Sequence, residues 1–352
     1  MLTPGGMFGD YRVIERLGKG GMGEIWRVEI ESRRQPFAVK ILDPALAAQD
    51  REFRKRFVRE AEIAMAVRHP NLVRVYDVGE DPDSGLCFII MQYVGGGSLS
   101  DRIAADGPLP TDEALDIVAQ LAGVLETARL DGVVHRDIKS ENILFSTEGV
   151  PMLTDLGIAR CRFAASATTV TKTGFMLGTP AYMAPEQMLD SHNVDCRADI
   201  YSLGIVLFEM LTGRRPNEGV TTMQLLKKAA TGEPIPDVRT VAPGVPGPVA
   251  KLIARMCEIE VDKRLATPAA VAEAVTAIRA GEDPFSPRPT RRTLSRRRRK
   301  LRRIILAAAV AAVAVIVADF AVYWFLLRKP PAETGKSVQE EEMDLYYIPG
   351  EG

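Results

Sequence analysis

The sequence has few cysteines, the residues that form the disulfides of small secreted domains and bind zinc in small metal-binding domains. Its 352 residues include four cysteines, Cys87, Cys161, Cys196 and Cys257, and no two of them form a CxxC pair. This spacing argues against a disulfide framework or a zinc motif and is typical of a reducing compartment. The opening stretch MLTPGGMFGDYRV lacks the apolar run of a signal peptide, so no secretion signal is expected.

The charge of the chain is balanced in total but unevenly distributed. There are 45 basic and 46 acidic residues, yet RPTRRTLSRRRRKLRR (residues 288–303) holds ten basic residues and no acidic one. The rest of the chain therefore carries 35 basic residues against 46 acidic ones. A basic run of this kind can bind nucleic acid. Here an apolar run follows it at once, which favours contact with membrane lipid and no nucleic-acid partner.

The apolar run IILAAAVAAVAVIVADFAVYWFLL (residues 304–327) is long enough to cross a bilayer, which needs about 20 apolar residues. Its one charge is Asp319, which we expect to reach the outer interface rather than pair with a neighbouring helix. Tyr323 and Trp324 stand where interfacial aromatic residues belong. The basic flank predicts a single-pass protein of the inner cell membrane, with residues 1–303 in the cytoplasm and the polar tail 328–352 outside.

The hydrophobic periodicity changes along the chain. Residues 11–94 alternate as strands, with one helical stretch in REFRKRFVREAEIAMAVRHP. From Thr111 onward the chain is mostly helical; Thr111–Leu130 has a capping-box-like start, and DIYSLGIVLFEMLTG is apolar nearly all round, as in a buried central helix. The pattern predicts an α+β fold with a small β-sheet lobe containing one helix and a larger helical lobe, then a linker and a transmembrane helix.

Two features of the first lobe indicate phosphate binding. Gly18, Gly20 and Gly23 form GxGxxG between two predicted strands, where glycine lets backbone N–H groups approach phosphate. A dinucleotide fold would need a helix after the last glycine, and a strand is predicted there instead. Lys40 lies on the next strand. We expect Glu60 of the following helix to pair with it and hold its ammonium group against nucleotide phosphates.

The stretch VVHRDIKSENILF (residues 133–145) places several polar groups between apolar runs that are typical of buried strands, and LTDLG follows it. Phosphoryl transfer needs a group that orients the attacking hydroxyl, a cation near the transferred group and oxygen ligands for magnesium. Asp137 suits the first role and Lys139 the second. Asn142 and Asp155 suit the third.

These motifs, taken in order with AVK, GTPAYMAPE and DIYSLG, resemble the protein kinase family over residues 11 to about 275. Lys139, two residues after Asp137, resembles the serine/threonine class, and the whole is similar to bacterial membrane-anchored kinases. The resemblance implies an N-terminal extension (1–10), a kinase domain (11–279, with lobes 11–94 and 95–279), a basic linker (280–303), the transmembrane helix (304–327) and the tail (328–352).

The resemblance also implies ATP with Mg²⁺, or Mn²⁺, as cofactors, and proteins bearing Ser or Thr as substrates. The ATP-binding residues it implies are Leu17, Gly18, Lys19, Gly20, Gly21, Met22, Gly23, Glu24, Ile25, Ala38, Lys40, Glu60, Met91, Tyr93, Val94 and Leu144. Glu186 and Arg264 should form a structural ion pair, and Asp199 should accept backbone N–H bonds from the catalytic loop.

Regulation is expected in the Thr-rich segment between Asp155 and Glu186. Arg136 precedes the catalytic aspartate and resembles an arginine that pairs with a phosphorylated activation loop. We expect autophosphorylation in trans, within a homodimer, at Thr171 or Thr173, with Thr168 and Thr169 as the alternative sites. Thr179 resembles the threonine of the substrate platform.

The chain departs from the family pattern at three places: Leu156 stands for a common Phe, Ser140 for a frequent Pro, and Gln92 for a common hinge Glu. None removes a catalytic group, which disfavours a second hypothesis, a membrane-tethered pseudokinase scaffold. A third, a small-molecule phosphotransferase, is disfavoured by GTPAYMAPE. Glu141 either favours basic residues before the acceptor or is simply a solvated acid.

Overall fold

The computed structural model describes residues 2–20, 23–30, 35–45, 51–82, 84–156, 180–190 and 193–286, together with 306, 311, 317–324 and 327. Within α2 the side chains of residues 51–53, 56 and 60 also lie outside this set. The chain divides into two units, Met1–Ser286 and Pro287–Gly352. Nearly all of the described residues belong to the first unit, and the candidate site lies within it.

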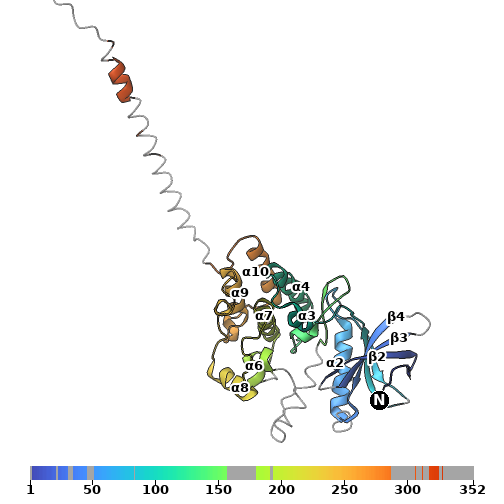
Figure 1. The fold of residues 1–352 in the computed structure, drawn as a ribbon. Coiled ribbons are helices and arrows are strands. Elements are labelled where there is room, and N and C mark those ends of the chain that lie inside the picture. The colour runs from blue at the N-terminus through green and yellow to red at the C-terminus, as the bar shows by residue number, and fades with distance from the viewer. Residues whose placement is uncertain are drawn as a thin grey trace, which may run out of the picture. The chain divides into compact units, whose positions relative to one another are not determined.

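The first lobe is an antiparallel sheet with one long helix (Figure 1). Its six strands lie in the order β1-β2-β3-β4-β6-β5. Their bounds are β1 Met7–Phe8, β2 Tyr11–Gly20, β3 Gly23–Ile30, β4 Gln35–Leu42, β5 Val75–Glu80 and β6 Cys87–Gln92, and the helix is α2 Arg51–Ala66. The five strands and the helix predicted from periodicity are confirmed, and β1 is an addition.

The sheet has two apolar faces because its central strands bury both sets of alternating side chains. One face gathers Phe8, Trp26 and Phe37, and the other packs Ala38 and Met91 against Phe57 of α2. Six consecutive residues of β4, Phe37–Leu42, are buried, including Lys40. A charged side chain is rarely buried without a partner, so the position of Lys40 already points to a specific role.

The second lobe is mainly helical (Figure 1). Its elements are α3 Leu99–Asp106, α4 Thr111–Leu130, η1 Ser140–Asn142, β7 Ile143–Phe145, β8 Pro151–Leu153, η2 Pro180–Tyr182, α6 Pro185–Leu189, α7 Cys196–Thr212, α8 Thr222–Thr231, η3 Val238–Thr240, α9 Gly247–Met256, η4 Val261–Lys263 and α10 Pro268–Arg279. Every residue of α7 from Ala198 to Leu211 is buried, as expected for a central helix. The predicted α+β, two-lobed fold is thereby confirmed.

Two local predictions were wrong. The capping box expected at Thr111 is absent: Pro110 occupies the N-cap position of α4 and offers no side-chain acceptor, so Thr111 is already helical. Capping boxes occur instead at Ser98 and Thr221. Residues 133–134 are not a strand, whereas Ile143–Phe145 pairs with β8 as predicted for a buried strand.

The predicted membrane helix lies mostly outside the described residues. Among the residues that the structure describes, no helix combines the length and apolar character needed to cross a bilayer. Most of residues 304–327, and the whole tail 328–352, lie outside the described residues.

Candidate active site

The loop His135–Asn142 connects α4 to β7 and is hydrogen-bonded to the buried helix α7. Asp199, 2% exposed, accepts the backbone N–H of His135 at Oδ2 and that of Arg136 at Oδ1, both at 2.8 Å. These are the bonds expected for Asp199. Its burial raises the pKa of the carboxyl above the ordinary range, and the charge of His135 and the two N–H bonds offset this only in part. Arg136 has a φ of 67°, a strained conformation for a non-glycine residue that these anchors maintain.

Asp137 is oriented by its neighbours in the same loop. Asn142 Nδ2 donates to the Asp137 carbonyl oxygen at 2.7 Å and to its Oδ2 at 3.1 Å. Lys139 Nζ lies 3.2 Å from the same Oδ2. The predicted catalytic pair and one predicted metal ligand are therefore brought together, with one carboxylate oxygen of Asp137 held in place.

Asp155 follows β8 and faces the first lobe. Its φ of 64° turns the chain sharply after the strand. Lys40 Nζ donates to Asp155 Oδ1 at 2.7 Å, so the two lobes meet in an ion pair. Burial acts to raise the pKa of Asp155, but the charge and hydrogen bond of Lys40, with smaller contributions from His135 and Lys139, lower it below its ordinary value. Asp155 is thus kept as a carboxylate.

The Lys40–Glu60 pair expected from sequence falls outside the described residues, because the side chain of Glu60 is not described. The partner that the structure gives Lys40 is Asp155. Gly21, Met22, Thr171, Thr173 and Thr179 also lie outside the described residues.

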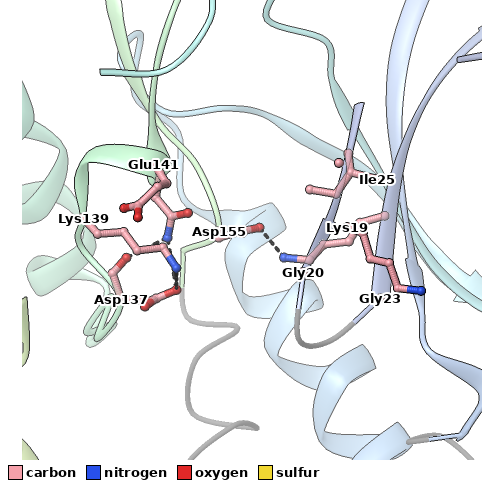
Figure 2. Close-up of a pocket in the computed structure, with 11 residues that line it drawn as sticks. Lys19, Gly20, Gly23, Ile25, Asp137, Lys139, Glu141 and Asp155 are labelled. Atoms are coloured by element: carbon pink, nitrogen blue, oxygen red, sulfur yellow. Dashed lines mark hydrogen bonds and ion pairs between the residues drawn. The ribbon is translucent and has the colours of Figure 1, made fainter. Parts of the chain in front are cut away.

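A cavity of about 210 Å³ lies between the glycine turn and the catalytic loop. Figure 2 shows Asp137, Lys139 and Glu141 on one side, Lys19, Gly23 and Ile25 on the other, and Asp155 between them. The other lining residues are Gly18, Gly20, Lys40 and Asn142. The lining brings together cations from both lobes and carboxylates from the second lobe, as a phosphate site with a metal requires.

At Gly23, which lines this cavity, the backbone of β3 lies very close to β4. Gly23 has a φ of 148°, and a Cβ there would lie 1.8 Å from the Ile41 carbonyl oxygen, so no other residue fits without moving β4. Glu24 is held beside it by Arg16 at 3.3 Å and Lys19 at 3.6 Å, and its carboxylate accepts the Trp26 indole N–H at 3.2 Å. Glu24 therefore links residues of β2 and β3 beside Gly23.

The apolar part of the predicted nucleotide site is also assembled. Ile25, Ala38, Met91, Val94 and Leu144 belong to one apolar cluster on the α2-facing side of the sheet. Leu17 is 44% exposed and stands apart from it. Tyr93 packs its ring under the Arg27 guanidinium, 5.1 Å from the ring centre.

One residue of this apolar cluster, Met152, was not predicted from the sequence. Met152 is buried among these residues, and it pairs with Leu144 across β7 and β8. The apolar PML that follows ILF after a short turn could have indicated this pairing.

Asn142 and Asp155 suit a bound magnesium ion. Both are oxygen donors lining one cavity, and Asp155 is kept ionised. Magnesium keeps waters and phosphate oxygens in its shell, so two protein ligands are adequate. Within the described residues no group of three or more His, Cys, Asp or Glu side chains could form a self-contained metal site.

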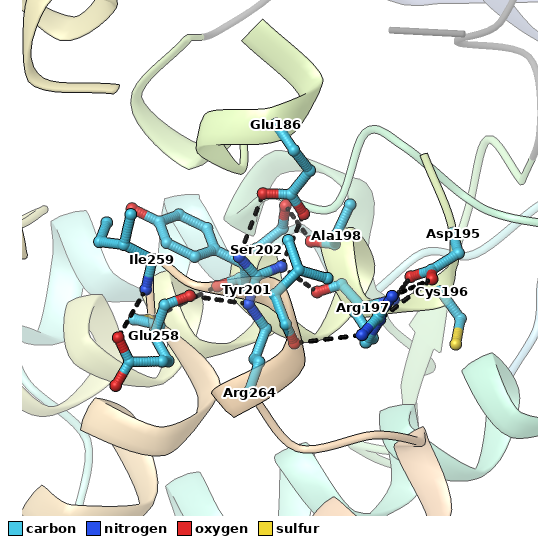
Figure 3. A network of polar contacts seen from close by, with 12 residues as sticks. Glu186, Asp195, Cys196, Arg197, Ala198, Tyr201, Ser202, Glu258, Ile259 and Arg264 are labelled. Atoms are coloured by element: carbon cyan, nitrogen blue, oxygen red, sulfur yellow. Dashed lines mark hydrogen bonds and ion pairs between the residues drawn. The ribbon is translucent and has the colours of Figure 1, made fainter. Parts of the chain in front are cut away.

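The predicted structural ion pair is present in the second lobe (Figure 3). Arg264 Nη1 lies 2.7 Å from Glu186 Oε1 and Nη2 lies 3.1 Å from Oε2, a bidentate pair. Arg264 also donates to the carbonyl oxygens of Glu258 at 2.9 Å and Arg197 at 2.7 Å. Its guanidinium lies 5.1 Å from the Tyr201 ring centre. This network ties α6 to α7 and to the turn before α10.

Comparison with known proteins agrees with this geometry. The family model described as the protein kinase domain matches residues 11–276. The chain is 38% identical over 274 residues to the probable serine/threonine-protein kinase pknA2 of Bifidobacterium longum, which covers 77% of this chain and 35% of that protein. It is 40% identical over 245 residues to the serine/threonine-protein kinase PrkC of Bacillus subtilis, which covers 70% of this chain and 37% of that one. The chain thus spans little more than a third of the length of these relatives.

A solved structure gives the same result for the fold. The crystal structure of the PknI kinase domain of Mycobacterium tuberculosis superposes with a TM-score of 0.64 at 30% identity, covering 80% of this chain and 100% of that one. The chain therefore belongs to the protein kinase family, and its kinase domain is of the serine/threonine type.

Proposed function

We propose that the chain is an active serine/threonine protein kinase that transfers the γ-phosphoryl group of ATP to Ser and Thr hydroxyls of proteins. The observation that carries the proposal is the convergence of Lys40, Asp137, Lys139, Asn142 and Asp155 on one cavity beneath the glycine turn. A pseudokinase scaffold would not need all five, since each serves the chemistry rather than the fold.

Each residue has a distinct part in the proposed mechanism. Asp137 accepts the proton of the attacking hydroxyl, and its orientation is set by Lys139 and Asn142. Lys40 binds phosphate oxygens, and Lys139 stabilises negative charge near the transferred group. Asn142 and Asp155 would hold Mg²⁺, which neutralises phosphate charge when bound. Because this chemistry is mostly positioning and electrostatics, the buried Lys40 and the ionised Asp155 are suited to it.

The proposal is tested by removing one charge at a time. Lys40→Met and Asp155→Ala should each abolish ATP-dependent phosphate transfer to a mixture of Ser/Thr peptides. Lys251→Met is the matched control, because Lys251 pairs with Asp283 on the exposed surface, and it should keep the wild-type rate. Thermal unfolding establishes that each variant is folded. Near-normal transfer by either folded variant would contradict the assignment, and a folded wild type that binds nucleotide without transferring phosphate would favour the scaffold.

We propose further that the kinase is activated by autophosphorylation in trans, within a homodimer, at Thr171 or Thr173. Support comes from the Thr-rich sequence and from Arg136 directly before Asp137. A phosphothreonine supplies nearly two negative charges and three acceptor oxygens to an arginine. Purified wild type should carry phosphate at these positions and Asp137→Asn should not. Full activity in a Thr171→Ala/Thr173→Ala double variant would refute this mechanism.

We also propose that residues 304–327 anchor the kinase domain at the cytoplasmic side of the inner membrane. Support comes from the length and apolar character of this segment, in which Asp319 is the one charge, and from the basic run 288–303 before it. Residues 288–303 act as a stop-transfer flank. In a second role, their basic side chains bind anionic lipid, and phosphorylation at Thr290, Thr293 or Ser295 weakens this binding as an electrostatic switch. A cysteine placed after residue 327 should react with an impermeant thiol reagent once the outer barrier is permeabilised. Protection of that cysteine would count against the orientation.

A further inference from the structure

A chain of hydrogen bonds joins the catalytic loop to two other parts of the second lobe. Ser140 begins η1, directly after Lys139 and two residues before Asn142. Its Oγ lies 2.9 Å from the Oη of Tyr182 in η2. Tyr182 Oη in turn donates to Glu209 Oε2 in α7 at 2.8 Å. The three residues are 0%, 3% and 9% exposed, so water is a poor substitute for any of these bonds.

The three side chains form one buried hydrogen-bonded cluster around the Glu209 carboxyl. A tyrosine hydroxyl has a single proton, and here that proton goes to the Glu209 carboxylate. The Ser140 hydroxyl bonds with Tyr182 and is also within hydrogen-bond reach of the Glu209 carboxyl itself, so both hydroxyls cluster around this buried group. A hydrogen bond that ends on a charged acceptor is stronger than a neutral one, and a chain of them is mutually reinforcing.

The backbone alone does not require a serine at this position. Ser140 is the first residue of a 3₁₀ turn, where an N–H has no intrahelical acceptor, and Lys139 before it is extended, with φ −161° and ψ 163°. Even a proline would be compatible with both features. The specific contribution of Ser140 is thus its hydroxyl.

The bond gives the catalytic loop a second attachment to the same helix. Asp199 of α7 holds the backbone of His135 and Arg136, just before Asp137. Glu209, ten residues further along α7 and therefore about 15 Å away along its axis, holds Ser140 through Tyr182, just after Asp137. Lys139 and Asn142, whose side chains orient Asp137, lie next to this second attachment.

We infer that Ser140 is a positioning residue: its hydroxyl, acting through Tyr182 and Glu209, holds Lys139 and Asn142 in the geometry that orients Asp137. The inference rests on the proposed kinase function. It also couples the catalytic loop to Pro180–Tyr182, the segment that follows the activation loop, so a displacement of that segment is passed to the catalytic loop.

The test is a double-mutant cycle with Ser140→Ala and Tyr182→Phe. Each single variant should lower kcat about 5- to 30-fold, the range given by loss of a buried hydrogen bond worth about 1–2 kcal/mol. The KM for ATP should stay within about twofold, because the apolar nucleotide cluster is untouched. The double variant should be no slower than the slower single variant, since both substitutions break one chain. Ser146→Ala is the matched control: its hydroxyl accepts the Glu148 and Val150 N–H groups in the β7–β8 turn, and its kcat should equal wild type.

Hydrogen exchange supplies a measurement that does not depend on activity. Amides of residues 140–143 should exchange faster in Ser140→Ala and Tyr182→Phe than in wild type, and equally fast in the double variant. Multiplicative losses of kcat in the double variant, or wild-type exchange in Ser140→Ala, would overturn the inference. A wild type without transferase activity would instead refute the proposed function, while the exchange data would still decide whether Ser140 holds the loop.

Discussion

Replacing Arg264 with alanine should destabilise the kinase domain far more than any exposed ion pair could. The Arg264 side chain is 0% exposed and that of Glu186 is 24% exposed, so this is a largely buried pair. The substitution removes two bonds to the Glu186 carboxylate and one each to the carbonyl oxygens of Glu258 and Arg197. Removing one partner of a buried pair costs about 3–5 kcal/mol, because the other charge is left uncompensated.

The assay is equilibrium urea unfolding, with thermal unfolding as a second measurement. A loss of about 3 kcal/mol should lower Tm by about 5 °C in a domain of this size. Lys263→Ala is the matched control in the adjacent position: Lys263 pairs with Glu260, and both side chains are more than half exposed, at 59% and 66%. Its effect should stay below about 1 kcal/mol. If Arg264→Ala and Lys263→Ala differed by less than about 1 kcal/mol, the reasoning about burial would be refuted.

Two further substitutions test packing and buried charge. Gly204→Ala should lower the free energy of unfolding in urea by about 1–3 kcal/mol, because a Cβ at this buried position of α7 would lie 2.6 Å from Cys257 Sγ. Gly247→Ala is the control and should be nearly neutral, because a Cβ there would have no neighbouring atom within 4 Å. Equal effects of the two substitutions would contradict this account. Burial is the main influence on Glu209 and raises the pKa of its carboxyl above the ordinary 4.5. The folded state therefore binds this proton more tightly than the unfolded state, so wild type should lose stability relative to Glu209→Gln as pH rises from about 4.5. A stability difference that does not change with pH would contradict the assigned shift.

The sequence was most informative where one local pattern determines an element. The strands β2 to β6 follow from alternation, and α7 follows from a run of apolar residues with hardly a polar face. Ordered motifs also predicted Asp137, Lys139, Asn142 and Asp155 as site residues, and the structure brings the four to one cavity; their roles stay a prediction.

Prediction failed at one helix boundary and where the outcome depends on contacts between distant segments. Thr111 has the sequence of a cap, yet Pro110 takes the N-cap position and the helix begins one residue earlier than the pattern suggests. The link from Ser140 to Tyr182 spans 42 residues, and that from Tyr182 to Glu209 spans 27. From the sequence, Ser140 was only a departure from a frequent Pro, whereas in the structure its hydroxyl attaches the catalytic loop to Tyr182.

The most direct test of the central claim is the effect of Asp137→Asn on transfer at saturating ATP, measured alongside nucleotide affinity. Asparagine keeps the size of the side chain but cannot accept the hydroxyl proton as a carboxylate does. The account predicts nucleotide affinity within a few-fold of wild type and a loss of phosphate transfer to Ser/Thr peptides of about 10²–10⁴-fold. A folded Asp137→Asn variant that binds nucleotide and transfers phosphate at a tenth of the wild-type rate or faster would contradict it.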